Sequence, residues 1–224
     1  MSSFFITGTG TGTGKTLVTT TLCWQLRQQG KKVMALKPVV SGYDANDPNN
    51  DTALILQSLG LPTTDADHIS PWRFSAPLSP NIASEKEGKS VDMEKLIEFC
   101  HRATSNQQPA TILVEGAGGV MSPLNNQHTM LDWMEMLGWP VILVAGTYLG
   151  SISHTLSALE ALKARKLTVA ALIVSESEEG VALTDTLATL KTFLPAAVPV
   201  VQLPRIKGAS KLWEQALPIH GFMR

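Results

Sequence analysis

A glycine-rich segment that leads into a lysine is the strongest chemical signal in the sequence. It follows an apolar run at residues 4–7 and extends from Gly8 to Gly14-Lys15-Thr16, where an amphipathic segment begins. Glycines let backbone N–H groups turn inward around phosphate oxygens, and a helix N-terminus adds partial positive charge. A lysine can reach the β- and γ-phosphates, and a threonine hydroxyl can bind Mg²⁺. The segment predicts a phosphate-binding loop rather than a flexible turn, although five residues separate the glycines instead of four.

Two acidic residues are placed where a metal ion bound to these phosphates would need them. Glu115 follows the apolar run at 111–114 and precedes several glycines, and Asp51 begins a predicted helix. Carboxylate oxygens are the ligands that Mg²⁺ prefers. We therefore predict that both residues bind Mg²⁺. The alternatives are a solvated carboxylate at a strand end for Glu115 and a simple helix cap for Asp51.

A second lysine lies in an apolar run, which is unusual. Lys37 follows the run at 33–36 and precedes Pro38. If its side chain points out of the carboxyl end of a strand, it enters the same cleft as Lys15. Two ammonium groups together with Mg²⁺ could neutralise a transferring phosphoryl group or an anionic intermediate. The alternative is a lysine whose aliphatic stem covers the sheet edge while its charge stays in water.

The histidines and cysteines give weaker signals. No two of the five histidines have metal-ligand spacing on one helix face, so we expect structural or solvated roles for them. Cys23 and Cys100 lie in helical patterns, which favours two free, buried thiols over reactive ones.

Apolar runs and amphipathic segments alternate along the chain, and these elements must position the residues above. We predict strands at 4–7, 33–40, 111–114, 141–144, 169–174 and 198–203. We predict helices at 15–29, 51–59, 93–105, 130–137, 151–166 and 183–193, with a less regular segment at 60–90. Apolar strands without alternation, separated by helices, are typical of a parallel sheet covered on both faces. The predicted fold is a three-layer α/β phosphate-loop NTPase fold in one domain, residues 1–224, with ligands beyond the carboxyl ends of the strands.

Composition excludes several classes of protein. Of the 224 residues, 44% are apolar and 17% are charged, which is too apolar for a disordered chain. Eighteen basic and 19 acidic residues give a net charge of −1, so we expect no nucleic-acid or membrane partner. Two cysteines cannot form a disulfide scaffold. The N-terminal segment lacks a secretory pattern, and we expect a cytoplasmic protein.

Five sequence segments together resemble the dethiobiotin synthetase family, over nearly the whole chain. The family's first motif, Gly-Thr-Asp-Thr-x-Val-Gly-Lys-Thr, corresponds to residues 8–16. A generic phosphate-loop ATPase would not show the segments around Lys37 and Asp51. The other segments are Lys37-Pro38-Val39-Val40-Ser41-Gly42, Asn50-Asp51 with Ala53-Leu54, Ser79-Pro80 with Glu87-Gly88, and residues 114–119 with Leu149-Gly150-Ser151-Ile152 and His154.

The resemblance implies a reaction in which 7,8-diaminononanoate, CO₂ and ATP give dethiobiotin, ADP and phosphate. One amine takes up CO₂ as a carbamate, and the carbamate attacks the γ-phosphate of ATP. The second amine then closes the ureido ring and expels phosphate. Each stage concentrates negative charge, which suits a cleft with two lysines.

The resemblance also implies roles for individual residues. Lys15 and Lys37 stabilise phosphate and carbamate charge, and Thr11 and Ser41 contact the reacting groups. Thr16, Asp51 and Glu115 hold Mg²⁺. The nucleotide contacts comprise Gly12, Thr13, Gly14, Lys15, Thr16, Leu17, Asp51, Glu115, Gly116, Ala117, Gly118, Ser175, Glu176, Pro204, Arg205 and Ile206.

The turn Leu149-Gly150-Ser151-Ile152 precedes a predicted helix whose free N–H groups suit a carboxylate. In the family this turn comes from the partner subunit and receives the carboxylate of the substrate. The resemblance therefore implies a homodimer with its substrate sites at the subunit interface.

Three positions depart from the family pattern. Gly10 stands where the family usually has Asp, and Thr13 where it usually has Val, which raises the ordering cost of the loop. Ser175 stands where many members have an Asn whose amide reads the adenine edge. A serine offers one hydroxyl in place of a paired donor and acceptor. We therefore expect this chain to prefer ATP over other nucleotides less sharply than relatives with Asn.

Three rival functions share some of these features. A regulatory or partitioning phosphate-loop ATPase would have the same fold and both acids, but it would act on a DNA or membrane surface. A cobyrinate-type amide synthase would need a glutaminase domain, for which we expect no room. The presence of Lys15, Lys37 and Glu115 counts against a binding module without catalysis.

Overall fold

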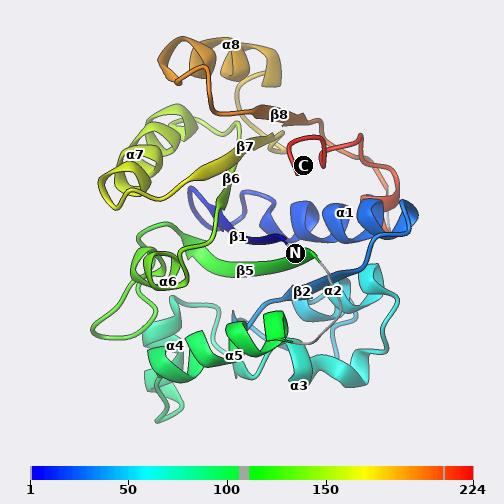
Figure 1. Cartoon of the computed structure of the whole chain (residues 1–224), viewed down its shortest axis with the longest axis vertical. Coiled ribbons are helices and arrows are strands. Elements are labelled where there is room, and N and C mark those ends of the chain that lie inside the picture. The colour runs from blue at the N-terminus through cyan, green and yellow to red at the C-terminus, as the bar shows by residue number, and fades with distance from the viewer. Residues whose placement is uncertain (1, 106–110, 209, 224) are drawn as a thin grey trace.

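A six-stranded parallel sheet forms the centre of the molecule. The structure is a computed structural model that describes residues 2–105, 111–208 and 210–223, so both ends of the predicted 1–224 domain lie outside the described residues. The strand order is β2-β5-β1-β6-β7-β8, and every neighbouring pair is parallel (Figure 1). The strands are β1 (Ser2–Gly8), β2 (Val33–Leu36), β5 (Thr111–Gly119), β6 (Val141–Ala145), β7 (Val169–Ser175) and β8 (Val200–Leu203). This arrangement confirms the predicted α/β fold.

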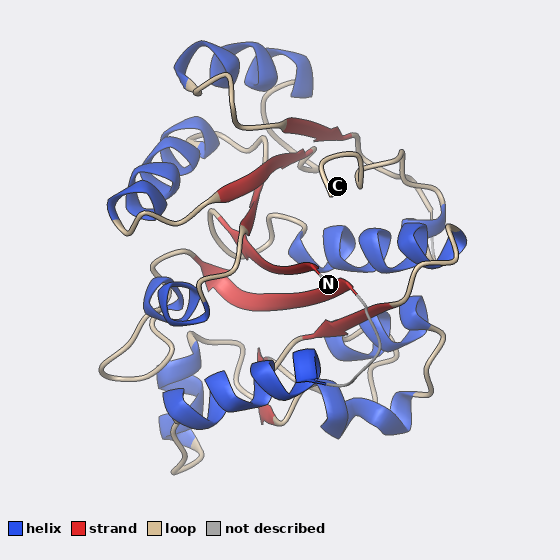
Figure 2. Ribbon diagram, viewed as in Figure 1, coloured by secondary structure: helices blue, strands red, loops and turns tan. Residues whose placement is uncertain are grey.

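Helices lie on both sides of the sheet, as Figure 2 shows. In the view of Figure 1, α1 and α2 lie to the right of the strands, and α6 and α7 lie to the left. The long helices are α1 (Lys15–Gln28), α2 (Asp51–Leu59), α5 (Met93–Ser105), α6 (Met130–Leu137), α7 (Ser151–Ala164) and α8 (Leu183–Phe193). The predicted apolar face of α1, formed by Val18, Leu22 and Leu26, is buried. One cluster of buried apolar side chains extends from Phe4 to Ile219 and fixes the sheet against these helices.

The predicted strand at 33–40 is wrong, because the structure has two short strands there. β2 ends at Leu36 and pairs with β5, whereas β3 (Val39–Ser41) pairs with β4 (Trp72–Phe74) in a separate two-stranded parallel sheet. Pro38 has no N–H for the β5 ladder, and the Lys37 N–H donates to the carbonyl of Ile69 at 3.0 Å. The chain therefore changes partner at Lys37, which places this side chain at the carboxyl end of the central sheet.

Several element ends also differ from the prediction. Helix α7 ends at Ala164 rather than at 166, because Lys166 adopts a left-handed φ of 55°. Helix α1 ends one residue early, and β8 begins at Val200, after Pro199. Strand β5 continues through its glycines to Gly119.

The irregular segment at 60–90 contains only short elements, in agreement with the prediction. They are η1 (Thr63–Asp65), α3 (Ala66–Ile69), β4 and α4 (Pro80–Lys86), and a further short helix, η2 (Leu212–Glu214), lies near the C-terminus. Helix α4 has a proline in its first turn, a position that needs no N–H donor.

Both cysteines are buried and unpaired, as the sequence predicts. Burial raises the pKa of the Cys23 and Cys100 thiols to about 12, so neither forms an appreciable thiolate near neutral pH. Within the described part of the chain, no helix has the length and apolar character needed to cross a membrane.

Candidate active site

The glycine-rich segment forms a closed loop between β1 and α1. The Lys15 ammonium reaches back over the loop and donates to the Gly10 carbonyl at 2.8 Å, and the Thr13 hydroxyl donates to the same carbonyl at 3.3 Å. A Cβ atom on Gly8 would lie 2.6 Å from the Thr13 hydroxyl oxygen and 3.1 Å from the Lys15 nitrogen. Only glycine fits this position without a shift of its neighbours.

Gly14 is the second position of the loop that requires glycine. It precedes α1 with a left-handed φ of 91°, and a Cβ atom there would lie 2.8 Å from the Ser175 hydroxyl oxygen. The close approach brings the end of β7 against the start of α1. The free N–H groups at the start of α1 thus face the region into which Lys15 extends.

Three predicted residues from three different elements meet at the carboxyl end of the sheet. The Lys37 ammonium forms ion pairs with Asp51 at 2.7 Å and with Glu115. Lys37 is 4% exposed and Glu115 is fully buried. The interpretation of Lys37 as an edge lysine with its charge in water is therefore wrong.

Helix α1 supplies two hydroxyl groups to the Glu115 carboxylate. Thr16 donates to Oε1 at 2.8 Å and Thr19 donates to Oε2 at 2.6 Å. The sequence analysis did not identify Thr19. The spacing of Thr16 and Thr19 was the available signal. Residues three apart lie on one face of a helix, so both side chains of α1 can reach the same strand.

The pKa values of this cluster reflect burial and the short distances between its charges. Burial and the neighbouring Lys37 ammonium lower the pKa of Lys15 to about 8. Burial also acts to lower the pKa of Lys37, but Glu115 and Asp51 outweigh it and hold that pKa above its usual value. Burial acts to raise the pKa of Asp51, yet Lys37 and the Thr16 hydroxyl hold it below its usual range. The cluster therefore keeps Lys37 cationic and Asp51 anionic.

The donor set of the cluster fits a magnesium ion that is bound together with phosphates. Thr16, Asp51 and Glu115 offer one hydroxyl and two carboxylate groups, all hard oxygen donors, and both carboxylates contact Thr16 and Lys37. The described residues contain no group of three or more His, Cys, Asp or Glu side chains that could hold a metal ion. Mg²⁺ usually keeps several waters and combines one or two protein carboxylates with substrate phosphates, so this set is sufficient.

A cavity of about 300 Å³ lies beside the loop. Nine of its lining residues belong to the predicted nucleotide contacts, namely Gly12, Thr13, Gly14, Leu17, Ser175, Glu176, Pro204, Arg205 and Ile206. Ser177, Glu178 and Leu212 also line it, and the sequence analysis missed them. Leu212 comes from a C-terminal segment that contains no local sequence motif.

Most polar side chains in this cavity already have partners. The Glu176 carboxylate accepts from the Arg205 N–H at 2.9 Å, and Glu178 pairs with the Arg205 guanidinium at 3.1 Å. The Ser177 hydroxyl accepts from the Thr147 N–H at 2.9 Å. Within the part of the chain that the structure describes, the Ser175 hydroxyl has no hydrogen-bond partner. Ser175 therefore offers the cavity one rotatable hydroxyl without a described partner.

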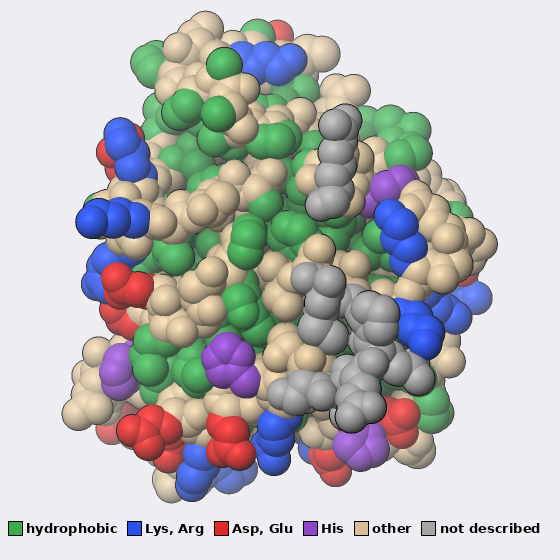
Figure 3. Space-filling view, in the orientation of Figure 1, with side chains coloured by type: hydrophobic (Ala, Val, Ile, Leu, Met, Phe, Trp, Pro, Cys, Tyr) green, Lys and Arg blue, Asp and Glu red, His purple; other side chains and the backbone are tan. Residues whose placement is uncertain are grey.

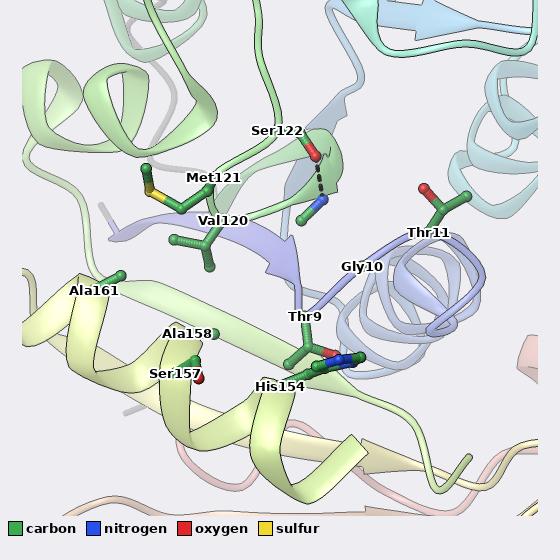
Figure 4. A pocket seen from close by; sticks show the side chains of 11 residues that line it. Thr9, Gly10, Thr11, Val120, Met121, Ser122, His154, Ser157, Ala158 and Ala161 are labelled. Atoms are coloured by element: carbon green, nitrogen blue, oxygen red, sulfur yellow. Dashed lines mark hydrogen bonds between the residues drawn. The ribbon is translucent and has the colours of Figure 1, made fainter. Parts of the chain in front are cut away.

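A second cavity, of about 480 Å³, lies between the start of the loop, the turn after β5 and helix α7 (Figure 4). Thr11 lines it, together with Val120, Met121 and Ala158. Figure 4 shows the Thr9 side chain next to the ring of His154. The lining combines hydroxyl groups at the loop with apolar side chains from the turn and the helix.

The remaining predicted residues have different surroundings. A Cβ atom on Gly116 would lie 2.9 Å from the Phe5 ring, so this glycine is explained by core packing, and Ala117 and Gly118 follow it along β5. None of these three residues lines the 300 Å³ cavity. The Ser41 hydroxyl oxygen is buried, and no described group pairs with it.

The turn at 149–152 is separate from the lysine cluster within this chain. Leu149 is 89% exposed, whereas Ser151 is buried and its N–H donates to the Tyr148 carbonyl at 3.0 Å. Gly150 has a left-handed φ of 93° and precedes α7, whose second residue is Ile152. Among the described residues, no hydrogen bond or ion pair joins this turn to Lys15 or Lys37.

Comparison with protein families and sequences identifies close relatives. The model of a family described as an AAA domain matches residues 2–208. The ATP-dependent dethiobiotin synthetase BioD of Caulobacter vibrioides is 46% identical over 206 residues, which cover 92% of this chain and 93% of the relative. The protein of the same name from Methylobacterium nodulans is 45% identical over 184 residues, covering 79% of this chain and 82% of the relative.

Solved structures show the same fold at low sequence identity. A ParA family ATPase from Chlorobium tepidum has a TM-score of 0.53 and 17% identity, covering 92% of this chain and 85% of the other. The MinC:MinD cell division complex of Aquifex aeolicus contributes a chain with a TM-score of 0.54 and 15% identity, covering 91% of this chain and 81% of the other. These similarities place the chain among the phosphate-loop NTPase folds.

Proposed function

The chain belongs to the ATP-dependent dethiobiotin synthetase family, and from that premise we propose that its two-lysine cleft converts 7,8-diaminononanoate to dethiobiotin. It is an ATP-dependent ligase of biotin biosynthesis that forms C–N bonds. The observation that carries the assignment of the cleft is the buried contact of Lys37 with Asp51 and Glu115 beside the phosphate loop.

The proposed reaction has three steps. An amine of the substrate attacks CO₂ and loses a proton, which forms a carbamate. A carbamate oxygen attacks the γ-phosphorus of ATP, and the bond from that phosphorus to the bridging oxygen of ADP breaks. The second amine then attacks the carbamate carbon, loses a proton and expels phosphate as the C–O bond breaks. Positioning and charge stabilisation by the protein supply most of the catalysis in such a sequence.

Lys15 and Lys37 have complementary roles in this proposal. Lys15 exchanges its contact with the Gly10 carbonyl for phosphate oxygens of ATP, and their charge favours its protonated form. Lys37 stabilises the charge that develops on the carbamate and the transferring phosphoryl group. This role of Lys37 is supported by its ion pairs with Asp51 and Glu115, which keep the Lys37 side chain cationic.

We propose that Thr16, Asp51 and Glu115 hold Mg²⁺, on the strength of their hard oxygen donors and mutual contacts. The ion supplies neutralisation of triphosphate charge when it is bound. Without the ion, Lys37 provides the counter-charge for both carboxylates, and a bound Mg²⁺ would supply a second cation to them.

The two cavities suit the two larger substrates. The 300 Å³ cavity beside Ser175 would take the nucleotide base, and the 480 Å³ cavity would take the diamine. Thr11 lines the second cavity, and its apolar residues Val120 and Met121 suit a hydrocarbon chain. The Ser41 hydroxyl is buried without a described partner, and it would pair with a reacting group once a local shift exposes it.

The proposal includes a homodimer in which each turn at 149–152 serves the site of the other subunit. Leu149 is 89% exposed, so its side chain is free to contact another chain. The start of α7 offers free N–H groups to the substrate carboxylate. We further propose that residues 1–224 act as one ligase domain and that the protein is cytoplasmic, which the shared apolar cluster and the two unpaired cysteines support.

The rival is a regulatory or partitioning ATPase, and phosphate release distinguishes the two functions. The ligase is expected to release phosphate only when ATP, Mg²⁺, bicarbonate and the diamine are all present, with dethiobiotin detected by mass spectrometry. Each component is left out in turn as a control. Equal phosphate release without the diamine would contradict the ligase and favour the ATPase.

A further inference from the structure

We propose that Thr19 is a positioning residue that fixes the carboxylate of Glu115 for the bound magnesium ion. The inference rests on the proposed function, because it takes Glu115 as a ligand of Mg²⁺. Thr19 itself is fully buried in α1 and lies one helical turn after Thr16. It therefore acts through Glu115 and does not touch the substrates.

The two oxygens of Glu115 have separate sets of donors. Oε1 accepts from the Thr16 hydroxyl at 2.8 Å and from the Lys37 ammonium. Oε2 accepts from the Thr19 hydroxyl at 2.6 Å. In the proposed function, Thr16 and Lys37 are the two donors that interact with incoming groups. Thr19 is the donor that stays in place while those contacts change.

The Thr19 hydroxyl has one proton and two acceptors within reach. The backbone carbonyl of Lys15 lies at 3.0 Å, which is the distance of an ordinary back-bond within a helix. Glu115 is closer, at 2.6 Å, and forms an ion pair with Lys37, and hydrogen bonds to a charged acceptor are about twice as strong as neutral ones. The proton therefore belongs to the bond with Glu115.

Loss of this donor would have two effects on Glu115. Oε2 would be buried without a partner, which is costly for a charged group. The carboxylate could also rotate about its own axis, and Mg²⁺ demands near-ideal octahedral geometry at short distances. Partners of this kind behind a metal ligand typically change metal affinity by about 10- to 100-fold when removed.

The test compares three variants with the parent protein. Thr19→Val keeps the shape and removes the hydroxyl, Thr19→Ser keeps the hydroxyl, and Thr21→Val is the matched control. Thr21 is also fully buried in α1, and its hydroxyl is among the buried groups without a described partner. Thr19→Ala provides a second variant without the hydroxyl if the valine variant does not fold, and thermal melting checks the fold of each variant.

The main readout is binding, not activity. Mn²⁺ is titrated into protein saturated with a non-hydrolysable ATP analogue and followed by electron paramagnetic resonance. Thr19→Val is expected to weaken Mn²⁺ binding about 10- to 100-fold. Thr19→Ser and Thr21→Val should bind it like the parent. In the ligase assay, Thr19→Val should require more Mg²⁺ and regain most of its turnover at saturating Mg²⁺.

Parental Mn²⁺ affinity in both Thr19→Val and Thr19→Ala would overturn the inference, as would an equal loss in Thr21→Val. That failure differs from a failure of the proposed function. If the parent itself neither binds Mn²⁺ with the nucleotide analogue nor makes dethiobiotin, the fault lies with the proposed function. If the parent binds Mn²⁺ and makes dethiobiotin, the results with the variants test only the proposed role of Thr19.

Discussion

At the scale of single residues, Lys37 connects the stability of the free protein to its chemistry. Its ammonium lies between Asp51 and Glu115 and is almost completely buried. A buried ion pair of this kind contributes little net stability, but removal of one partner leaves an uncompensated buried charge. The residue is thus needed in the free protein and, by the proposed mechanism, again during phosphoryl transfer.

Lys37→Ala is expected to lower kcat by about 10²- to 10³-fold, because it removes a cation that acts on developing charge. Binding of Mg–ATP should remain mostly intact, since the loop from Gly8 to Thr16 holds the triphosphate. The free protein should melt at a lower temperature, and Mg–ATP should restore part of the loss by replacing the missing cation. Calorimetry and steady-state kinetics measure these effects.

The control for this change is Lys31→Ala, which removes an exposed lysine next to α1. It should leave both melting and turnover unchanged. Near-normal turnover in Lys37→Ala would show that Lys37 only neutralises the two carboxylates.

Ser175 gives a second prediction at this scale, which concerns the nucleotide base. Its free hydroxyl can donate or accept, so a wrong base leaves no buried amide unpaired. We expect kcat/KM to differ little among ATP, CTP and GTP in the parent. Ser175→Asn should raise the preference for ATP about 5- to 150-fold, which corresponds to ~1–3 kcal/mol for one unsatisfied polar group.

A parent that already prefers ATP by several orders of magnitude would contradict this prediction. Another group in the cavity, such as the backbone near Pro204, would then read the base.

The sequence predicted the site residues that belong to a recognisable local motif. Lys15 and Thr16 follow from the glycine loop, and Glu115 follows from its place after an apolar run. Spacing from Thr16 indicates the helix face of Thr19, but the contact of Thr19 with Glu115 and the packing of Gly116 against Phe5 could not be predicted in this way. Both depend on the distance between two elements that are about 100 residues apart in the chain, and only the folded sheet sets that distance.

At the scale of elements, a helix cap places Asp51. The Asn50 side chain accepts from the Ala53 N–H at 2.9 Å and starts α2, so Asp51 is the first residue of that helix. Asp51 is therefore next to a cap rather than the cap itself. Helix α6 begins in a similar way at Thr129, whose side chain forms a capping box with Asp132, away from the cleft.

Asn50→Ala and Thr129→Ala form a matched pair of cap deletions. Each should lower the free energy of unfolding by ~0.5–2 kcal/mol, and the melting temperature by about 2–4 °C per kcal/mol. Only Asn50→Ala should raise the Mg²⁺ concentration needed for half-maximal turnover, because it releases the helix start that presents Asp51. Urea unfolding and Mg²⁺ titration of activity measure the two effects.

A similar Mg²⁺ requirement in the two variants would show that the cap does not position Asp51. Both variants should still lose stability in urea. That loss would show that each substitution removed its cap, even if the Mg²⁺ requirement did not change.

The sequence predicted most elements by type and order, because buried parallel strands lack alternation and the helices are amphipathic. It failed at residues 33–40, where the apolar run continues but the hydrogen-bond partner changes. Apolar residues lie on both sides of Lys37-Pro38, so hydrophobicity alone did not mark the change of partner. Pro38 was the available signal, since a residue without an N–H cannot continue a central ladder.

At the scale of the whole molecule, the view in Figure 3 shows acidic and basic side chains mixed along the lower edge. The charges along this edge do not form the single-sign patch by which a switch ATPase would bind DNA or an anionic membrane. The assembly that we propose is two copies of this chain. The sequence could imply that assembly only through family resemblance, because its contacts join different chains.

Mixed dimers test whether the two subunits share their sites. Lys37→Ala damages the cleft, and Leu149→Glu adds negative charge where the substrate carboxylate should bind without disturbing a buried residue. Each variant alone should be weakly active at low diamine concentration. After subunit exchange at equal concentrations, activity should rise to roughly a quarter of the parental value, because half of the dimers have one intact site of two.

If activity does not rise although mass spectrometry shows exchanged dimers, the turn at 149–152 serves its own chain. The homodimer could remain, but its shared site would be rejected.

The central claim is that a carbamate of the substrate, not water, takes the γ-phosphoryl group from ATP. Oxygen labelling tests it most directly. CO₂ labelled with ¹⁸O is mixed rapidly with enzyme, Mg–ATP and the diamine, and the phosphate is analysed by mass spectrometry before the label exchanges with water. The account predicts one oxygen from CO₂ in each phosphate released, because ring closure breaks the carbon–oxygen bond. Phosphate that instead carries oxygen from the solvent would contradict it.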